Sequence, residues 1–416
     1  MKILFVLPRS PWPPYVGQSR LAYFRAQELR GLGHEVHLFC YGLGVRNLTP
    51  EQLKQLSSAY NSINSVNLSR YELMLNFILR FPFLFFLGRS FLANAFTPAS
   101  ISKCFNRCLE AQQFDIVHFY SIRSSPLWPL LSLFNIPYVA DLVDSMSLNF
   151  ANRVQNCRSI LKPLLRLEYL RLRAFESNLP NVSLCRSYVV VAQADLSCLS
   201  IAHASIDANY PRSSGPDLKL CPIGVKPFEP VSGDDEMCSV APRIVFFGSL
   251  SYTPNIDALK WFIDYVYPIV SESILDIEFL ILGSNPTDSV VAYASKFSSI
   301  RLIANPPSIR PYLLNSFASV APMISGSGQQ FKIIESLANK VPCVSTSLAA
   351  SALSLVNGVH LCIADSPAEF ASKILLLHQD LRFASRIASI GCEHVMNRYS
   401  WRSSAEKLVS IYNVSA

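Results

Sequence analysis

Lys332 and Glu335 follow a glycine-rich turn, Gly326-Ser327-Gly328, and have the types and spacing expected of a site for a charged ligand. The turn stands before a helical stretch, where free backbone N–H groups and the positive end of the helix dipole favour an anion. A lysine near the turn and a carboxylate one helical turn later suit a diphosphate attached to a ribose. The alternative is a solvated ion pair after an ordinary turn between a strand and a helix.

The elements that would position these residues are a strand, the turn, a helix and a second strand. Apolar runs at 318–323 and 341–345 are typical of buried strands, and a helix is expected over about 330–339. Phe331, Ile334 and Ala338 fall on one face of that helix at helical spacing.

The composition is that of a folded protein with more than one domain. With 416 residues, 50% hydrophobic and 16% charged, the chain is long enough for two well-packed domains. A formal net charge of +7 permits contact with anionic substrates or an anionic membrane surface. No block of like charges and no interleaving of aromatic and basic residues indicates nucleic-acid binding, so no nucleic-acid partner is expected.

The eleven cysteines are scattered without zinc-like pairing, so most are expected to be buried thiols and no metal site is predicted. Cys104 and Cys108 are four residues apart, as on one helix, with no second pair to complete a site. The amino terminus, MKILFVLPRSPWPP, lacks a basic region before a long apolar stretch. It is predicted to be a strand and not a signal peptide, which favours a cytoplasmic protein.

Strands and helices alternate along the first half of the chain. Strands are predicted at 3–7, 36–40, 115–120 and 137–143, with a helix at 18–32. In open α/β sheets ligands bind at the carboxyl ends of strands, which is where Gly17, His118, Tyr120 and Asp144 are expected. A charged amphipathic helix is predicted over 160–180, with solvated carboxylates at Glu168 and Glu176.

The segment 70–100 is strongly apolar and aromatic, but Arg80, Pro82, Gly88 and Arg89 interrupt it. No run reaches the ~18–20 apolar residues of a membrane-spanning helix. Two interpretations remain: a pair of core helices, which we favour, or an element at the headgroup boundary of an anionic membrane.

A second alternation of strands and helices begins at residue 243, after a polar and acidic segment that is the best linker in the chain. Strands are predicted at 243–247 and 277–282, each followed by a glycine, Gly248 and Gly283. Two such series predict two doubly wound domains, and the cleft between them is the expected ligand site.

The chain resembles glycosyltransferase family 4, the retaining group 1 glycosyltransferases. The segments that carry the resemblance are VFFGSLSYTPNIDALKWF, FLILGSNP, the stretch from PYLLNSF to PCVST, and YSW in the second half. In the first half, GLGHEV, FDIVH and PIGV agree with it. The likeness covers nearly the whole chain and is closest in character to the subgroup found with bacterial exopolysaccharide clusters.

The resemblance implies the GT-B fold, an α/β architecture of two facing Rossmann-like domains with a cleft between them. Residues 1–228 would form the acceptor domain, 229–242 the linker and 243–395 the donor domain. A C-terminal helix within 396–416 would cross back to the first domain.

The resemblance also implies retaining transfer of a hexose-type sugar from a nucleotide diphosphate sugar, without metal or cofactor. The acceptor would be a saccharide or a lipid-linked molecule in bacterial surface polysaccharide synthesis, reached from the cytoplasm or from the inner face of the plasma membrane. Glu335 would hold the donor ribose and Lys332 would neutralise the diphosphate. The other expected donor-binding positions are Gly17, Gly248, Gly283, Gly326, Ser327, Gly328 and Gln329. Asp144 and His118 are the candidate catalytic residues, although a histidine inside an apolar strand is more often a packed core residue.

Three positions depart from the family pattern. Ser327 stands where many members have a first glutamate, Ser249 replaces a phosphate-binding arginine, and Tyr120 replaces a histidine. Because of these departures, an alternative is that the protein is a non-catalytic relative that binds sugar nucleotides or acts as a scaffold. A sugar-nucleotide epimerase of the same fold is a further alternative, but the chain is poor in the carboxylates and histidines that it needs.

Overall fold

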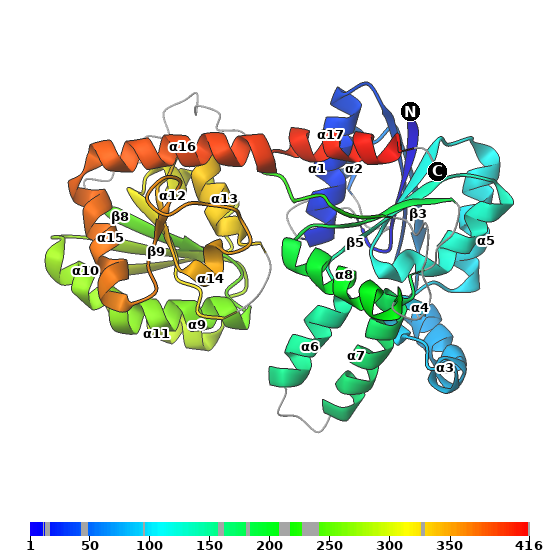
Figure 1. The fold of residues 1–416 in the computed structure, drawn as a ribbon, viewed down its shortest axis with the longest axis horizontal. Helices are drawn as coiled ribbons and strands as arrows, with labels where there is room; N and C mark the ends of the chain where they lie inside the picture. Colours follow the sequence, from blue (N-terminus) through cyan, green and yellow to red (C-terminus); the bar gives the residue numbers. More distant parts are fainter. Residues whose placement is uncertain are drawn as a thin grey trace. The chain divides into compact units, whose positions relative to one another are not determined.

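A computed structural model of the chain describes residues 1–10, 12, 17–42, 49–94, 96–156, 162–179, 184–207, 217–226, 241–325 and 329–414. Internal contacts divide the chain into two compact units (Figure 1). Unit 1 comprises Met1–Gly224 and Trp401–Ala416, and unit 2 comprises Val225–Ser400. The division therefore falls at 224 and 400, whereas the predicted boundaries are 228 and 395. Residues 229–240 of the predicted linker lie outside the described residues.

Unit 1 contains a seven-stranded parallel sheet in the order β3-β2-β1-β4-β5-β6-β7. The strands are β1 (Lys2–Leu7), β2 (Glu35–Gly42), β3 (Ser62–Asn67), β4 (Ile116–Tyr120), β5 (Tyr138–Val143), β6 (Cys185–Val190) and β7 (Asp217–Leu220). The order reverses direction between β1 and β4, so the expected ligand edge is at the carboxyl ends of these two strands.

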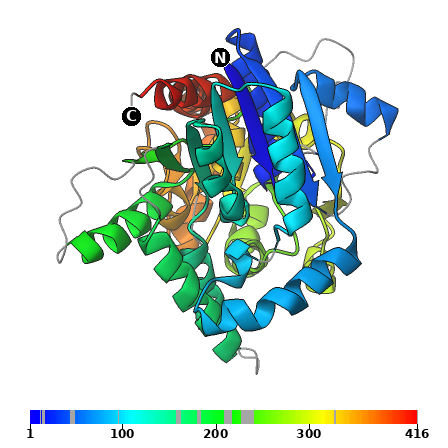
Figure 2. The same cartoon turned by 90° about the vertical axis from the view of Figure 1, so that its right-hand side faces the viewer.

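Helices cover the sheet of unit 1, and the last of them comes from the end of the chain (Figures 1 and 2). They are α1 (Gly17–Gly31), α2 (Pro50–Ser57), α3 (Arg70–Phe86), α4 (Phe91–Asn94), α5 (Ala99–Ala111), the 3-10 helix η1 (Ile122–Leu133), α6 (Met146–Asn156), α7 (Lys162–Ser177), α8 (Gln193–Asp207) and α17 (Trp401–Tyr412). Helix α17 lies beside α1, so the carboxyl-terminal segment belongs to unit 1. Helix α17 lies within the predicted range 396–416, of which residues 396–399 belong to the end of α16.

A buried ion pair between Arg25 and Asp141 joins α1 to β5 in unit 1, and both side chains are inaccessible to solvent. Arg25 Nε also donates to Ser404 Oγ on α17 (2.9 Å), and its Nη2 donates to the carbonyl oxygen of Cys221 (2.7 Å). Tyr412 Oη on α17 lies 2.8 Å from Nδ1 of His118 on β4. These bonds tie the last helix to the centre of the sheet.

Unit 2 contains a six-stranded parallel sheet in the order β10-β9-β8-β11-β12-β13. Its strands are β8 (Arg243–Phe247), β9 (Glu278–Gly283), β10 (Ile300–Ala304), β11 (Ala318–Ala321), β12 (Cys343–Ser345) and β13 (Cys362–Ile363). The order reverses direction between β8 and β11. The predicted sequence of strand, turn, helix and strand over 318–345 is confirmed as β11, α13 and β12.

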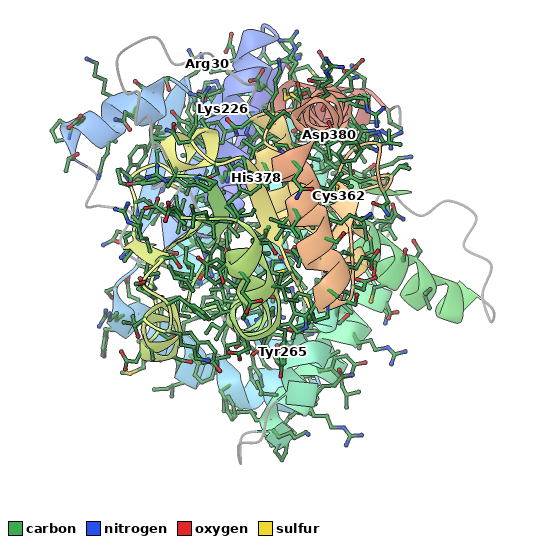
Figure 3. All side chains as sticks on the ribbon, turned by 90° about the vertical axis from the view of Figure 1, so that its left-hand side faces the viewer. Arg30, Lys226, Tyr265, Cys362, His378 and Asp380 are labelled. Carbon is green, nitrogen blue, oxygen red and sulfur yellow. The ribbon has the colours of Figure 1, made fainter. Side chains whose placement is uncertain are left out.

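The helices of unit 2 pack on both faces of its sheet around one large apolar core. They are α9 (Thr253–Trp261), the π-helix η2 (Phe262–Val266), α10 (Tyr267–Ser273), α11 (Asp288–Ala294), α12 (Arg310–Leu314), α13 (Phe331–Ala338), α14 (Ser347–Ala350), α15 (Pro367–Gln379) and α16 (Leu381–Tyr399). Figure 3 shows this unit from its outer side, with Asp380 at the junction of α15 and α16. Asp380 Oδ1 accepts a hydrogen bond from Phe383 N (2.9 Å) and so caps α16.

Two sequence predictions for unit 1 are wrong. The favoured core placement of 70–100 fails for α3, where large apolar side chains such as Ile78 and Leu79 are 56% and 69% exposed. Glu168 and Glu176 are buried, not solvated, and each carboxylate accepts several hydrogen bonds from neighbouring N–H and O–H groups. Helical periodicity alone did not reveal those donors, because they lie on other elements.

We expect Asp141→Asn to lower the free energy of unfolding of unit 1 by about 3–5 kcal/mol, because it leaves the Arg25 guanidinium buried without its counter-charge. The matched control is Asp264→Asn, which removes the exposed ion pair with Lys296 and should change stability by about 0–1 kcal/mol. Urea denaturation monitored by hydrogen exchange measures both, at β5 and α17 for the Asp141 variant and at η2 and α11 of unit 2 for the control. Equal losses in the two variants would contradict a structural role for the buried pair.

Candidate anion site of unit 2

Several of the predicted donor-binding residues of unit 2 lie where its strand order reverses. Gly248 directly follows β8, and Met323 follows β11, the neighbouring strand. Lys332 is in the first turn of α13, which connects β11 to β12. The carboxyl ends of two adjacent strands and a helix N-terminus thus meet at one edge, the usual ligand position in such sheets.

Gly248 and Gly283 allow the loops after β8 and β9 to pack closely. A Cβ atom on Gly283 would lie 1.8 Å from the carbonyl oxygen of Gly248, and one on Gly248 would lie 2.8 Å from Nδ2 of Asn255. The backbone N–H of Gly248 donates to the carbonyl oxygen of Leu282 (3.0 Å). Close backbone packing therefore accounts for both glycines, whether or not they also contact a ligand.

Lys332 is buried, with 6% of its side chain exposed, so a solvated ion pair is ruled out for this residue. Its Nζ donates to Oδ1 of Asn255 (2.6 Å), contacts Sδ of Met323 (3.1 Å) and lies 4.4 Å from the centre of the Phe246 ring. Among the described residues, no carboxylate forms an ion pair with it. The ammonium group is thus held by neutral partners alone.

Burial lowers the pKa of Lys332 from its ordinary value of 10.5 to about 7, because the charged form loses its hydration. The positive end of the α13 dipole also disfavours a cation at this position. Gln330, the N-cap residue of α13, makes no side-chain capping hydrogen bond. An anion bound here would satisfy both the lysine and the first N–H groups of the helix.

Asn255 is the residue of this site that the sequence analysis missed. It lies in the first turn of α9 and is 6% exposed. Its Nδ2 donates to the carbonyl oxygen of Ser249 (2.9 Å) while its Oδ1 accepts from Lys332. One amide therefore fixes the loop after β8 and the lysine together. The sequence did not indicate this role of Asn255, because an asparagine in the first turn of a helix is common.

The remaining predicted donor residues of unit 2 lie on or before α13. Glu335 is half-buried in the middle of the helix. Gln329 stands just before the helix, and its Oε1 is buried with no hydrogen-bond partner among the described residues, as is Ser325 Oγ. Gly326, Ser327 and Gly328 lie between these two side chains and outside the described residues. Two unsatisfied polar atoms thus flank the predicted glycine-rich turn.

At the ligand edge of unit 1, Gly17 is the first residue of α1 and Asp144 follows β5. Asp144 is exposed, and partial desolvation together with the negative charge of Asp141 raises its pKa. Val143, immediately before it, has a φ of 69°, a rare conformation for a β-branched residue. The N–H of Val143 donates to Oδ1 of Asp141 (2.8 Å), which helps to hold this strained turn and thereby Asp144.

His118 is fully buried and belongs to the hydrogen-bonded core of unit 1. Its Nδ1 lies 2.8 Å from Tyr412 Oη, its Nε2 is 3.6 Å from Oδ2 of Asp141, and burial lowers its pKa. Tyr120 is equally buried. Neither side chain is accessible to solvent, so both pack in the core of unit 1, and the catalytic role of His118 stays a prediction.

The described residues contain no group of three or more histidine, cysteine or acidic side chains that could hold a metal ion. Nor does any helix in the described part of the chain combine the length and apolar composition needed to cross a membrane. The nine described cysteines are free thiols.

The two Rossmann-like units, each with its ligand edge at a reversal of strand order, define a protein of the GT-B fold. Residues 241–380 match the family model described as Glycosyl transferases group 1. Unit 2 therefore carries a group 1 glycosyltransferase domain.

One curated relative is similar over part of the chain: an uncharacterized 44.6 kDa protein in the cps region of Klebsiella pneumoniae. It is 25% identical over 165 residues, which cover 38% of this chain and 42% of that protein. The matched region thus spans about two fifths of the relative's length.

Solved glycosyltransferase structures share the fold over almost the whole chain. A glycosyltransferase from Rickettsia africae aligns with a TM-score of 0.62 at 16% identity, over 99% of this chain and 97% of that one. HepE of Anabaena, solved in complex with UDP and glucose, aligns with a TM-score of 0.61 at 14% identity, over 99% and 98% of the two chains. A mutant of S. aureus TarM, in complex with Fondaparinux, alpha-GlcNAc-glycerol and UDP, aligns with a TM-score of 0.64 at 13% identity, over 100% of both.

We expect Lys332→Met to stabilise unit 2 by about 1–4 kcal/mol below pH 7, where the wild type must bury a charged ammonium group. The gain should shrink as the pH rises from about 7 to 10.5, because the folded wild type then holds a neutral lysine while the unfolded chain stays protonated. The measurement is the thermal midpoint across that pH range. Lys373→Met, on α15, is the control and should show no such pH dependence. A Lys332→Met variant that is less stable than the wild type at low pH would refute the account.

Proposed function

We propose that this protein transfers a sugar from a nucleotide diphosphate donor that binds at the anion site of unit 2. The observation that carries the proposal is the buried Lys332 ammonium group, whose partners among the described residues are neutral and which lies in the first turn of a helix that its N-cap residue Gln330 does not cap. A diphosphate supplies the negative charge that this environment lacks. The family of the domain makes a nucleotide sugar the natural source of that diphosphate.

In the proposed reaction the bond between the anomeric carbon and the diphosphate oxygen breaks, and negative charge builds on the leaving phosphate. Lys332 and the first N–H groups of α13 stabilise that charge in the transition state. Glu335, on the same helix, holds the donor ribose through its hydroxyl groups, as the family resemblance implies. We propose that transfer retains the anomeric configuration and needs no metal ion.

The donor is proposed to be a UDP-sugar carrying a hexose. The support is that HepE and TarM, which share this fold, were solved with UDP bound. Gly248, Gly283, Gln329 and the turn Gly326-Ser327-Gly328 are the proposed neighbours of the diphosphate and sugar. Gly17, at the ligand edge of unit 1, is proposed to approach the same ligand.

We propose that the acceptor, a saccharide or a lipid-linked molecule, is bound by unit 1. Asp144 is the exposed carboxylate at the ligand edge of that unit, with a raised pKa that suits proton transfer. The relative encoded in a cps region supports a role in bacterial surface polysaccharide synthesis. A lipid-linked acceptor would place the protein at the inner face of the plasma membrane.

A non-catalytic role in sugar-nucleotide binding is the second candidate. It is favoured by the three departures from the family pattern, at Ser249, Ser327 and Tyr120. Of these, Ser249 takes part in the site through its backbone carbonyl, which Asn255 holds. Binding of a nucleotide sugar without transfer or hydrolysis would identify this alternative.

We expect one nucleotide class among UDP-, GDP-, ADP- and CMP-sugars to raise the thermal midpoint of the protein, because a ligand that binds only the native state stabilises it by mass action. Glu335→Ala should abolish most of that shift while the unliganded midpoint stays within a few degrees. Glu393→Ala, an exposed carboxylate on α16, is the control and should keep the full shift. Absence of a shift with every donor would defeat the proposal, and full transferase activity in Glu335→Ala would refute the role of that carboxylate.

Donor binding above about pH 7 is expected to take up as much as one proton per site, since the bound diphosphate raises the lowered pKa of Lys332. Calorimetric titration in buffers of different ionisation enthalpy measures this uptake directly. The Lys332→Met variant should bind more weakly and show no uptake. Identical proton uptake in the two proteins would exclude Lys332 from the diphosphate site.

A further inference from the structure

Helix α3 exposes an apolar surface of a size that is unusual for a soluble domain. Over Tyr71–Leu87 the side chains of Tyr71, Met74, Ile78, Leu79, Phe86 and Leu87 are all more than half exposed. Contiguous exposed apolar surface of this kind marks an interaction site more often than a free surface. The less exposed positions Leu73, Asn76, Arg80 and Leu84 recur at helical spacing and form the inner face, so the exposed apolar side chains lie on the rest of the helix.

The inner side of α3 borders an apolar groove of about 330 Å³ between α3, α4, α6 and α7. Phe81 stacks on Phe91 with ring centroids 5.0 Å apart, and Phe150 and Leu164 line the opposite wall. The one carboxylate at the groove, Glu168, is fully engaged: it accepts from Ser90 Oγ (2.7 Å) and from the N–H groups that follow. The described residues that line the groove are therefore apolar apart from this hydrogen-bonded carboxylate.

The four elements that form the groove are strongly basic. Residues 70–94, 146–156 and 162–177 carry eight arginines and lysines and three glutamates. Two of those glutamates, Glu168 and Glu176, are buried and hydrogen bonded, which leaves Glu72 as the one acidic side chain at the surface of these segments. Arg70, Arg89, Arg166 and Arg173 are exposed. Apolar side chains beside basic ones match the two signals that hold a protein on an anionic bilayer.

The position of this surface fits the proposed acceptor edge of unit 1. Helix α3 begins three residues after β3, and α6 begins three residues after β5, so both start at the carboxyl edge that carries Asp144. Figures 1 and 2 show α3, α6 and α7 at the end of unit 1 away from α17. A molecule anchored at this surface would have its head group on the side of the acceptor edge.

We propose that α3 lies in the headgroup region of an anionic bilayer and that the groove between α3, α4, α6 and α7 takes an acyl chain of a bilayer lipid. The groove thereby holds unit 1 at the surface from which a lipid-linked acceptor is presented. The inference rests on the proposed function only for the identity of that acceptor. Membrane binding and donor binding are measured in separate experiments, so a negative result for one proposal does not affect the test of the other.

The first test is flotation of the full-length protein with vesicles of phosphatidylcholine containing phosphatidylglycerol, and with vesicles of phosphatidylcholine alone. Binding is expected to the anionic vesicles and to be at least about tenfold weaker without phosphatidylglycerol, since each basic residue near the surface adds to the attraction. The double variant Leu79→Ser, Phe86→Ser should lose at least about tenfold in binding to the anionic vesicles. Its side chains are 69% and 85% exposed, so the fold should survive.

The matched control is Leu275→Ser with Leu381→Ser, two leucines of unit 2 that are 86% and 71% exposed. It should bind vesicles like the wild type. Equal binding by both double variants, or none by the wild type, would overturn the proposal. A concentration-dependent dimer that the α3 variant loses, without any vesicle binding, would assign the surface to a second copy of the chain instead.

The second test asks whether a lipid chain enters the groove. A tryptophan is introduced as Leu164→Trp in the groove wall, with Leu133→Trp at the end of η1 as the control. Phosphatidylglycerol brominated on its acyl chains should quench the fluorescence at 164 well beyond the wild-type background and leave that at 133 unchanged. Vesicle binding without quenching at 164 would refute the groove as an acyl-chain site. The thermal shift with nucleotide sugar should persist in both variants and so shows that the fold and donor site remain intact.

Discussion

Two of the buried cations among the described residues, Arg25 and Lys332, differ in the charge of their partners. Arg25 is inaccessible to solvent, but it has the Asp141 carboxylate, a serine hydroxyl and a carbonyl oxygen as partners. Lys332 is almost as deeply buried, and its partners among the described residues are an amide oxygen, a thioether and an aromatic ring. Burying a charge without a counter-charge is costly. Arg25 holds the carboxyl-terminal helix on unit 1, whereas Lys332 is the residue at which we propose that an anion binds.

The strands and the two-domain architecture could be predicted from sequence because buried parallel strands read as continuous apolar runs. The runs at 3–7, 243–247 and 341–345 became β1, β8 and β12 with small shifts at their ends. The polar strand β3 was missed for the same reason: Ser62–Asn67 is not an apolar run, and it forms the edge of its sheet. Lys332 and Glu335 could be proposed as site residues from sequence because the free N–H groups of a helix N-terminus after a glycine-rich turn favour an anion.

Contacts between distant segments could not be predicted. Asn255 and Lys332 are far apart in sequence, and their hydrogen bond exists because β8 and β11 are neighbours in the sheet. Glu168 reads as a surface residue of an amphipathic helix, but the N–H groups that bury it belong to α4. The burial of His118 depends likewise on Tyr412, from the last helix of the chain. In each case the environment of a polar side chain is set by the fold and not by its own segment.

In unit 1 the apolar side chains at the centre of the sheet are buried, whereas those of α3, a helix that begins at the edge of the sheet, are largely exposed. The centre of the sheet needs complete burial, since Asp141 must hold both Arg25 and the strained turn that presents Asp144. Helix α3, which leaves the same edge, is not needed to cover that centre and leaves large apolar side chains exposed. Folding alone would favour polar side chains there, because exposed apolar surface invites aggregation. Exposed apolar side chains beside basic residues are explained if, as we propose, a lipid bilayer buries them.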